Sequence, residues 1–281
     1  MQTVQDAQAL RAAIHGWREK GQTVALVPTM GNLHAGHYSL VRLARERAER
    51  VVASVFVNPT QFGPNEDYTR YPRTLAQDQA GLAEHGCDLL FAPEVATVYP
   101  FGAEHGVSVH VPQVTEMLEG AHRPGHFDGV ATVVAKLFNL VQPDLAVFGQ
   151  KDYQQLKVIE RMVRDLALPV KVLGAPIQRA DDGLALSSRN QYLSAAERAL
   201  APQIHQTLRL MQELIGEGHA CHAVELVATA RLERAGFMPD YTAIRRADDL
   251  GVPEEHARQG LVALIAARLG TTRLIDNLQL A

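Results

Sequence analysis

The stretch VALVPTMGNLHAGHYSL, residues 24–40, decides which fold the chain can adopt. Val24–Val27 is a short aliphatic run, which is typical of a buried parallel strand. From Tyr38 to Arg50 the apolar residues recur at helical spacing and the charges fall on the opposite face. Residues Pro28–His37 therefore join a strand to the N-terminus of a helix. This geometry directs backbone N–H groups and the positive end of the helix dipole at a bound anion, usually a phosphate.

Two histidines and two glycines lie within this turn. His34 and His37 are three residues apart, so both can face the same point from the first helical turn. Gly31 and Gly36 let the backbone approach a ligand closely or adopt a positive φ. A single histidine is more often structural than catalytic, but the four residues together indicate a functional site.

Composition excludes several classes of protein. The chain has 281 residues, enough for one large or two ordinary domains, and its net charge of −4 provides no basic field for nucleic acid. Cys87 and Cys221 are far apart and lack metal-ligand spacing, which favours a reducing compartment. The N-terminus has no apolar signal-peptide core, and no apolar run approaches the roughly 18 residues of a membrane span. We expect a cytoplasmic protein without nucleic-acid or membrane partners.

Alternating strand and helix patterns predict an α/β fold, a doubly wound parallel sheet over residues 1–176, followed by a smaller α+β domain over residues 177–281. In the first domain we expect helices at Val4–Glu19 and Gly129–Val141, a loop at Met117–Gly129, and strands at Val51–Val57, Cys87–Pro93, Val107–Val111, Asp144–Gly149 and Val170–Arg179. In the second we expect helices at Ala195–Gly216 and Cys221–Gly236, then strands at Tyr241–Arg245 and Leu261–Ala267.

Several polar residues follow the predicted strands. Asn58 and Gln61 come just past the second strand, where open α/β sheets place ligand contacts, although Asn-Pro also favours a plain turn. Lys151 lies at the start of a predicted helix, where its positive charge is unfavourable with the helix dipole. Either a bound ligand or solvation of the side chain explains a lysine at this position. The run from Ser187 to Arg189 provides three donors suited to a polyphosphate, but such residues are common in loops.

Other chemistries are disfavoured. The G-x-G-x-x-G and Walker motifs are both absent, which argues against a nicotinamide or flavin enzyme and against a P-loop kinase. His122 and His126 lack a supporting carboxylate or thiol cluster, and the string HACH at His219–His222 lacks further ligands. No zinc-type site is expected at either place.

The motifs resemble a known family. LHAGH is similar to the H-x-G-H signature of the class I nucleotidyltransferases, and PTMGNLHAGH resembles the form found in pantoate–β-alanine ligases (pantothenate synthetases). The same family is resembled by FVNPTQF (56–62), YPRT (71–74), RPGHF (123–127), FGQKDYQQL (148–156), LALSSRN (184–190) and RLIDN (273–277). Gln150 stands where glutamate is common and Leu186 where methionine is common; the second change conserves volume.

The resemblance implies a Rossmann-like H-x-G-H nucleotidyltransferase domain that binds nucleotide and pantoate, with a C-terminal domain that closes over the active site. It implies that ATP, pantoate and β-alanine give pantothenate, AMP and pyrophosphate through a pantoyl adenylate, with Mg²⁺ present and a homodimer formed. The residues that it marks as catalytic are His34, His37, Lys151, Ser187, Ser188 and Arg189. Those that it marks for ATP are Pro28, Met30, Gly31, His34, Gly36, His37, Gly149, Lys151, Asp152, Gln178, Leu186, Ser187, Ser188 and Arg189.

For pantoate and β-alanine the resemblance marks Asn58, Gln61, Tyr71, His126, Val130 and Gln155. Asp78 is the one protein ligand expected for Mg²⁺, which the ATP phosphates would mostly hold. Two alternatives stay open: another H-x-G-H adenylyltransferase with a different acceptor, and a nucleotide-binding or scaffold protein without catalytic activity.

Overall fold

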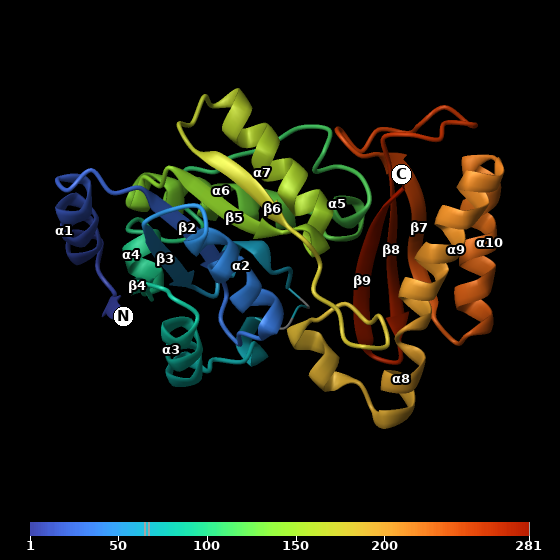
Figure 1. Cartoon of the computed structure of the whole chain (residues 1–281), viewed down its shortest axis with the longest axis horizontal. Coiled ribbons are helices and arrows are strands. Elements are labelled where there is room, and N and C mark those ends of the chain that lie inside the picture. The colour runs from blue at the N-terminus through green and yellow to red at the C-terminus, as the bar shows by residue number, and fades with distance from the viewer. Residues whose placement is uncertain (65, 67, 281) are drawn as a thin grey trace. The chain divides into compact units, whose positions relative to one another are not determined.

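A computed structural model describes residues 1–64, 66 and 68–280. The chain divides into two compact units, Met1–Gln150 with Val158–Pro176, and Lys151–Lys157 with Ile177–Ala281. Each unit contains one β-sheet, which is parallel in the first and antiparallel in the second (Figure 1).

The first unit is built on a six-stranded sheet in which every pair is parallel. Its strand order is β1-β4-β3-β2-β5-β6. The strands are β1 (Gln2–Val4), β2 (Val24–Thr29), β3 (Arg50–Val55), β4 (Leu89–Phe91), β5 (Leu145–Gly149) and β6 (Lys171–Ala175). The predicted doubly wound α/β sheet is confirmed. Because the strand order reverses between β2 and β5, the carboxyl ends of these two strands flank the switch point where such sheets bind ligands.

Helices cover both faces of this sheet (Figure 1). They are α1 (Ala7–Arg18), α2 (Ala35–Arg45), α3 (Leu75–Glu84), α4 (Val95–Val98), α5 (Glu119–His122), α6 (His126–Val141) and α7 (Tyr153–Asp165), the last of which begins in the second unit. Leu40 and Val41 of α2 pack in a core cluster with Val147 of β5. Phe148 alternates to the other face, where its ring centroid lies 6.4 Å from that of Phe138 in α6.

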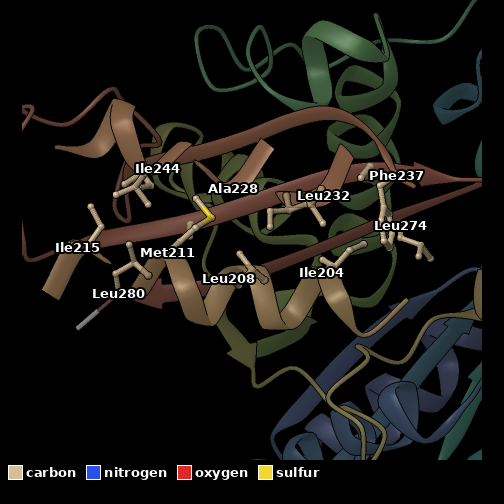
Figure 2. Packing of buried hydrophobic residues seen from close by; sticks show 14 of the residues in the cluster. Ile204, Leu208, Met211, Ile215, Ala228, Leu232, Phe237, Ile244, Leu274 and Leu280 are labelled. Carbon is tan, nitrogen blue, oxygen red and sulfur yellow. The ribbon is translucent and has the colours of Figure 1, made fainter. Parts of the chain in front are cut away.

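The second unit packs helices against an antiparallel sheet of β7 (Met238–Arg246), β8 (Leu261–Leu269) and β9 (Thr272–Leu280). Its helices are α8 (Ala195–Leu200), α9 (Gln203–Glu217) and α10 (Cys221–Arg234). Figure 2 shows the core between them, where Leu208 and Met211 of α9 pack with Leu280 of β9 and Ala228 of α10. The predicted smaller α+β region at the C-terminal end is confirmed.

One expected strand is absent, and one expected helix begins later than predicted. Residues Val107–Val111 form no strand; Val107 is 82% exposed, and Val109 N–H donates to the Thr132 side chain (2.8 Å) instead of to a neighbouring strand. The predicted first helix begins at Ala7 and not at Val4, because Gln2–Val4 pairs with Leu89–Phe91 at the sheet edge.

Helix boundaries also differ. The helix expected over Ala195–Gly216 is broken into α8 and α9 at Ala201 and Pro202, because proline has no backbone N–H to continue the helical hydrogen bonds. The loop expected over Met117–Gly129 contains the short helix α5, and α6 already begins at His126. In the described ranges, no helix is both long and apolar enough to cross a membrane.

Candidate active site

The turn after β2 is shaped by a buried carboxylate. Asp78 of α3 is 1% exposed, and it accepts hydrogen bonds from the backbone N–H groups of Asn32 (3.0 Å) and Leu33 (2.8 Å) and from the Thr74 hydroxyl (3.2 Å). Gly31 has a φ of 87°, and a Cβ there would lie 3.0 Å from Asp78 Oδ2. These contacts give Asp78 a structural role in the turn. Its assignment as a metal ligand stays a prediction, and the described residues include no group of three or more His, Cys, Asp or Glu that could hold a metal.

The two motif histidines cap helix α2. Nδ1 of His34 accepts from Gly36 N–H (3.1 Å), and Nδ1 of His37 accepts from His34 N–H (3.3 Å), which closes a capping box. The ring centroids are 4.2 Å apart. Because both Nδ1 atoms accept, each neutral imidazole carries its proton on Nε2. The backbone thus sets both rings as Nε2–H donors at a helix N-terminus, which is a site suited to an anion.

Past the end of β3, Gln61 is held between two side chains. Its Nε2 lies 3.0 Å from the Met30 sulfur, and its Oε1 accepts from Nδ2 of Asn58 (3.1 Å). Asn58 is 1% exposed, and its Oδ1 accepts from the hydroxyls of Thr60 (3.0 Å) and Tyr99 (2.7 Å). These contacts match the turn interpretation of Asn58: its amide is used within the protein to hold Gln61. A contact of Asn58 with substrate stays a prediction.

Close packing joins this turn to helix α6. A Cβ on Gly129 would overlap the Thr60 carbonyl and lie 2.7 Å from Cα of Gln61, so only glycine lets the helix approach. The next residue, Val130, is 2% exposed. Tyr71, another predicted substrate residue, is also buried, and its ring meets Phe62 edge-on with centroids 5.9 Å apart.

His126, at the start of α6, belongs to a network that ends on the Gln61 main chain. Its Nδ1 lies 2.8 Å from the Gln61 carbonyl and its Nε2 lies 3.0 Å from Arg123, so the neutral ring donates from Nδ1 and accepts at Nε2. Arg123 also makes two hydrogen bonds to the Glu66 carboxylate (2.7 and 2.6 Å). Burial works to raise the pKa of Glu66, but the hydrogen bond and charge of Arg123, together with smaller effects of His126 and the Gly63 backbone, lower that pKa overall.

Burial, and then the nearby charge of Arg123, lower the pKa of His126 from 6.5 to about 4. An unfolded chain takes up this proton as the pH falls through 6.5, whereas the folded chain resists protonation until about pH 4. We therefore expect His126 to reduce the free energy of unfolding by about 2 kcal/mol between about pH 7.5 and about pH 5. Urea titrations at both pH values measure this change in the free energy of unfolding.

His126→Asn is the matched variant for this prediction, because its amide can still donate to the Gln61 carbonyl but does not titrate. Its unfolding free energy should fall less over the same pH interval, by the amount that His126 contributes. Equal pH dependence in the two proteins would contradict the pKa assigned to His126.

The remaining predicted residues, apart from Pro28 on β2 and Gly149 at the end of β5, lie in the second unit. Lys151 and Asp152 occupy a 3-10 turn, η3 (Gln150–Asp152), with Lys151 half-buried and Asp152 exposed. The Lys151 carbonyl accepts from Nδ2 of Asn277 (2.9 Å). Gln155 is half-buried on the first turn of α7. Predicted contacts of these side chains with ATP or pantoate stay predictions.

The residues from Gln178 to Arg189 form a hairpin that leads into a 3-10 helix. Leu186 N–H donates to the Gln178 carbonyl (2.9 Å), and Arg179 pairs with Ala185 in an antiparallel bridge. Ser187 then caps η4 (Ser188–Tyr192), its hydroxyl accepting from Arg189 N–H (3.3 Å). The predicted S-S-R phosphate-binding segment is therefore the ordered start of a helix in this structure.

Two groups of residues with contacts to this machinery were not predicted as site residues. Arg123 lies in the quoted string RPGHF, but its partner Glu66 carries no local signal, because the pair forms across 57 positions of sequence. Asp276 and Asn277 lie in the quoted string RLIDN, where the motif alone indicates no role for either residue.

The parallel sheet, with an H-x-G-H motif following the strand beside its switch point, defines a Rossmann-like nucleotidyltransferase of the H-x-G-H class. A model of the pantoate-beta-alanine ligase family matches residues 2–279. The chain belongs to the pantoate–β-alanine ligase family.

Individual relatives agree with this assignment. The chain is 58% identical over 283 residues to the pantothenate synthetase of Xanthomonas campestris pv. campestris (strain B100), covering 99% of each chain. Its structure is similar to that of pantothenate synthetase from Thermus thermophilus, with a TM-score of 0.93 and 50% identity over 100% of this chain and 99% of the other. It is also similar to pantoate-beta-alanine ligase from Francisella tularensis complexed with beta-gamma ATP and beta-alanine, with a TM-score of 0.83 and 33% identity over 99% and 97%.

Proposed function

We propose that this chain joins pantoate to β-alanine in two steps at the expense of ATP. A carboxylate oxygen of pantoate attacks the α-phosphorus of ATP, and the bond to pyrophosphate breaks, which leaves a pantoyl adenylate. The amine of β-alanine then attacks the acyl carbon, and the bond to AMP breaks as pantothenate forms. The observation that carries the proposal is the family match over residues 2–279. That match favours this reaction over an adenylyltransferase with another acceptor.

The chemistry explains the need for ATP. A free carboxylate is a poor electrophile because its leaving group would be oxide, whereas AMP leaves readily from a mixed anhydride. The protein then has to position the reactants and stabilise the charge that develops on the phosphates.

We assign His34 and His37 to donate from Nε2 to phosphate oxygens as negative charge builds, which their backbone-fixed tautomers support. Lys151 and the run from Ser187 to Arg189 would hold the phosphates and the departing pyrophosphate through charged and hydroxyl donors. We assign Asp152 to accept hydrogen bonds from ribose hydroxyls, and Met30 and Gly149 to contact the nucleoside.

Gln61 and Gln155 are proposed to hold the hydroxyl and carboxylate groups of pantoate. Both are neutral amides, and a neutral partner leaves the carboxylate more nucleophilic than an arginine clamp would. The fixed position of Gln61, between Met30 and Asn58, supports its assignment because it limits the rotamers that must be ordered on binding.

Mg²⁺ is proposed to enter with ATP and to be held mainly by phosphate oxygens, supplying positive charge that offsets theirs. The two carboxylate oxygens of Asp78 already accept backbone N–H groups, which supports a main role for the phosphates in holding the metal. The family resemblance further supports a homodimer located in the cytoplasm.

Acceptor profiling tests the proposed function. The protein is incubated with ATP and Mg²⁺, and AMP is measured with pantoate and β-alanine together and with each replaced by related acids or amines. Rapid AMP formation that requires both substrates is expected. Equal turnover with an unrelated acid would instead support an adenylyltransferase with a different acceptor. ATP binding without any turnover would support a nucleotide-binding protein without catalytic activity.

Gln155→Ala should raise the KM for pantoate by about 10-fold, the scale of one lost hydrogen bond to a charged group, and leave the KM for ATP unchanged. Asp152→Asn is the reciprocal variant on the same segment. It should raise the KM for ATP and leave the KM for pantoate unchanged. Initial-rate kinetics with each substrate varied measure both effects. A selective loss of ATP affinity in Gln155→Ala would contradict its assignment.

A further inference from the structure

Strand β9 of the second unit carries two adjacent buried polar residues, Asp276 and Asn277, each 4% exposed. Successive residues of a strand point to opposite faces of the sheet. Asp276 therefore shares the face of Leu274 and Leu280, which pack in the core beneath α9 and α10 (Figure 2). Asn277 shares the opposite face with Gln279. The two side chains thus reach different parts of the unit from a single point on the strand.

Asp276 holds the hairpin that precedes the S-S-R segment. Its carboxylate accepts two hydrogen bonds from the Arg179 guanidinium, at 2.6 and 2.9 Å. Arg179 also donates to the Gly183 carbonyl (3.1 Å), at the tip of the hairpin. The fork geometry fixes the orientation of the guanidinium as well as its distance. The hairpin that ends at Ser187 is therefore attached to β9 by an ion pair whose carboxylate is buried and whose guanidinium is half-buried.

Asn277 holds the segment that carries Lys151. Its Nδ2 donates to the Lys151 carbonyl (2.9 Å), within the 3-10 turn before α7. Two residues along, Gln279 donates to the Tyr153 hydroxyl (3.2 Å), and this hydroxyl donates to the Ala247 carbonyl (2.8 Å). Segment 151–157 is thus attached to the same face of the sheet at two points, of which only Asn277 contacts Lys151.

The two attachments are coupled to each other. Asn277 N–H donates to Oδ1 of Asp276 (2.8 Å), and the Asn277 carbonyl accepts from Arg179 (3.3 Å). The main chain at Asn277 is therefore part of the same network as the ion pair. A shift of the hairpin at Arg179 therefore moves the main chain at Asn277, and a shift of Asn277 moves Arg179, because hydrogen bonds join the two.

We infer that Asp276 and Asn277 are positioning residues, which fix Lys151 relative to the Ser187–Arg189 segment so that both meet the ATP phosphates in one geometry. The inference rests on the proposed phosphate-binding roles of those two segments. Neither residue is assigned a contact with substrate: Asp276 acts through Arg179 and the hairpin, and Asn277 acts through the Lys151 main chain. Their adjacency on one strand is what links the two segments.

Asn277→Ala in the full-length chain tests the inference, with Asn277→Asp as a second variant that keeps the side-chain size but removes the donor. Gln279→Ala is the matched control, because it removes an amide donor from the same face and the same strand without contacting Lys151. For each protein, pantoate-dependent pyrophosphate release is measured with ATP and with pantoate varied separately, and thermal unfolding is recorded.

Both Asn277 variants should raise the KM for ATP and slow adenylate formation by about 10-fold to 100-fold, the scale of a misplaced catalytic group, with the KM for pantoate unchanged. Gln279→Ala should stay within about 2-fold of the parent protein. A purely structural role would lower the unfolding temperature and the active fraction, and would leave both KM values unchanged. That pattern, or parent-like rates in both Asn277 variants, would overturn the inference.

The outcome is separable from failure of the proposed function. If the parent protein releases no pyrophosphate in response to pantoate, the proposed reaction is overturned, and the inference with it. If the parent protein is active and the Asn277 variants match Gln279→Ala, only the positioning role is overturned.

Discussion

His37→Ala should slow pantoate-dependent pyrophosphate release by about 10² to 10³-fold, the effect of removing one preorganised donor to a developing charge. The Nδ1 atom of His37 is occupied by the His34 N–H (3.3 Å), so its Nε2–H is the proton that can be given to a phosphate oxygen. Single-turnover measurements of pyrophosphate release with excess enzyme report this step directly. An unchanged rate would remove His37 from the mechanism.

Two further substitutions at this position separate its two contacts. His37→Asn can keep an oxygen near the Nδ1 position to accept from His34 N–H, but it does not reach the Nε2 position. His37→Gln can place an amide N–H near Nε2. We expect the glutamine variant to recover part of the lost rate, and the asparagine variant to keep the cap of α2 without recovering the rate. The reverse order would show that capping of α2, and not donation to phosphate, explains the loss in His37→Ala.

Asp78→Ala is expected to have the largest effect on stability among the site residues. It leaves the N–H groups of Asn32 and Leu33 without their acceptor in a half-buried turn. Each such group costs about 1–3 kcal/mol when it is buried, so for the two groups the free energy of unfolding should fall by up to about 2–6 kcal/mol. Chemical denaturation measures this loss. Adenylate formation should slow as well, because the same turn sets the position of His34.

The dependence of activity on Mg²⁺ distinguishes this structural role from the predicted metal-ligand role of Asp78. If Asp78 only holds the turn, the Mg²⁺ concentration for half-maximal rate should be unchanged in the folded fraction of Asp78→Ala. Near-normal stability, combined with activity that is restored by raised Mg²⁺, would instead support direct metal ligation.

Local pattern predicted the centre of the fold well. The aliphatic run of β2 and the helical spacing of α2 are short-range signals, and the structure places both elements where the sequence indicated them. The pairing of strands at the sheet edge has no short-range signal in the sequence. Strand β1 is only three residues long, and it forms because Gln2–Val4 pairs with Leu89–Phe91, which lies far along the chain. Val107–Val111 has an alternating pattern but pairs with no strand in the described part of the chain, so it stays irregular.

The sequence predicted which residues belong to the candidate site, but not the hydrogen bonds that hold them. The sequence placed His34 and His37 on one helical turn, yet their tautomers follow from hydrogen bonds with backbone N–H groups that form only in the folded chain. The sequence left two roles open for Asn58, a turn residue or a ligand contact. Its hydrogen bonds within the protein depend on residues distant in sequence, such as Tyr99 and Gly129. Such long-range partners leave no periodic trace in a single sequence.

The two-step reaction is tested most directly by pyrophosphate release from ATP and Mg²⁺ in the presence of pantoate, before and after β-alanine is added. With pantoate alone, we expect a burst of about one pyrophosphate per active site, because the adenylate stays bound. Addition of β-alanine should then start continuous formation of AMP and pantothenate. Absence of any pantoate-dependent release, with or without β-alanine, would contradict the proposed ligase activity.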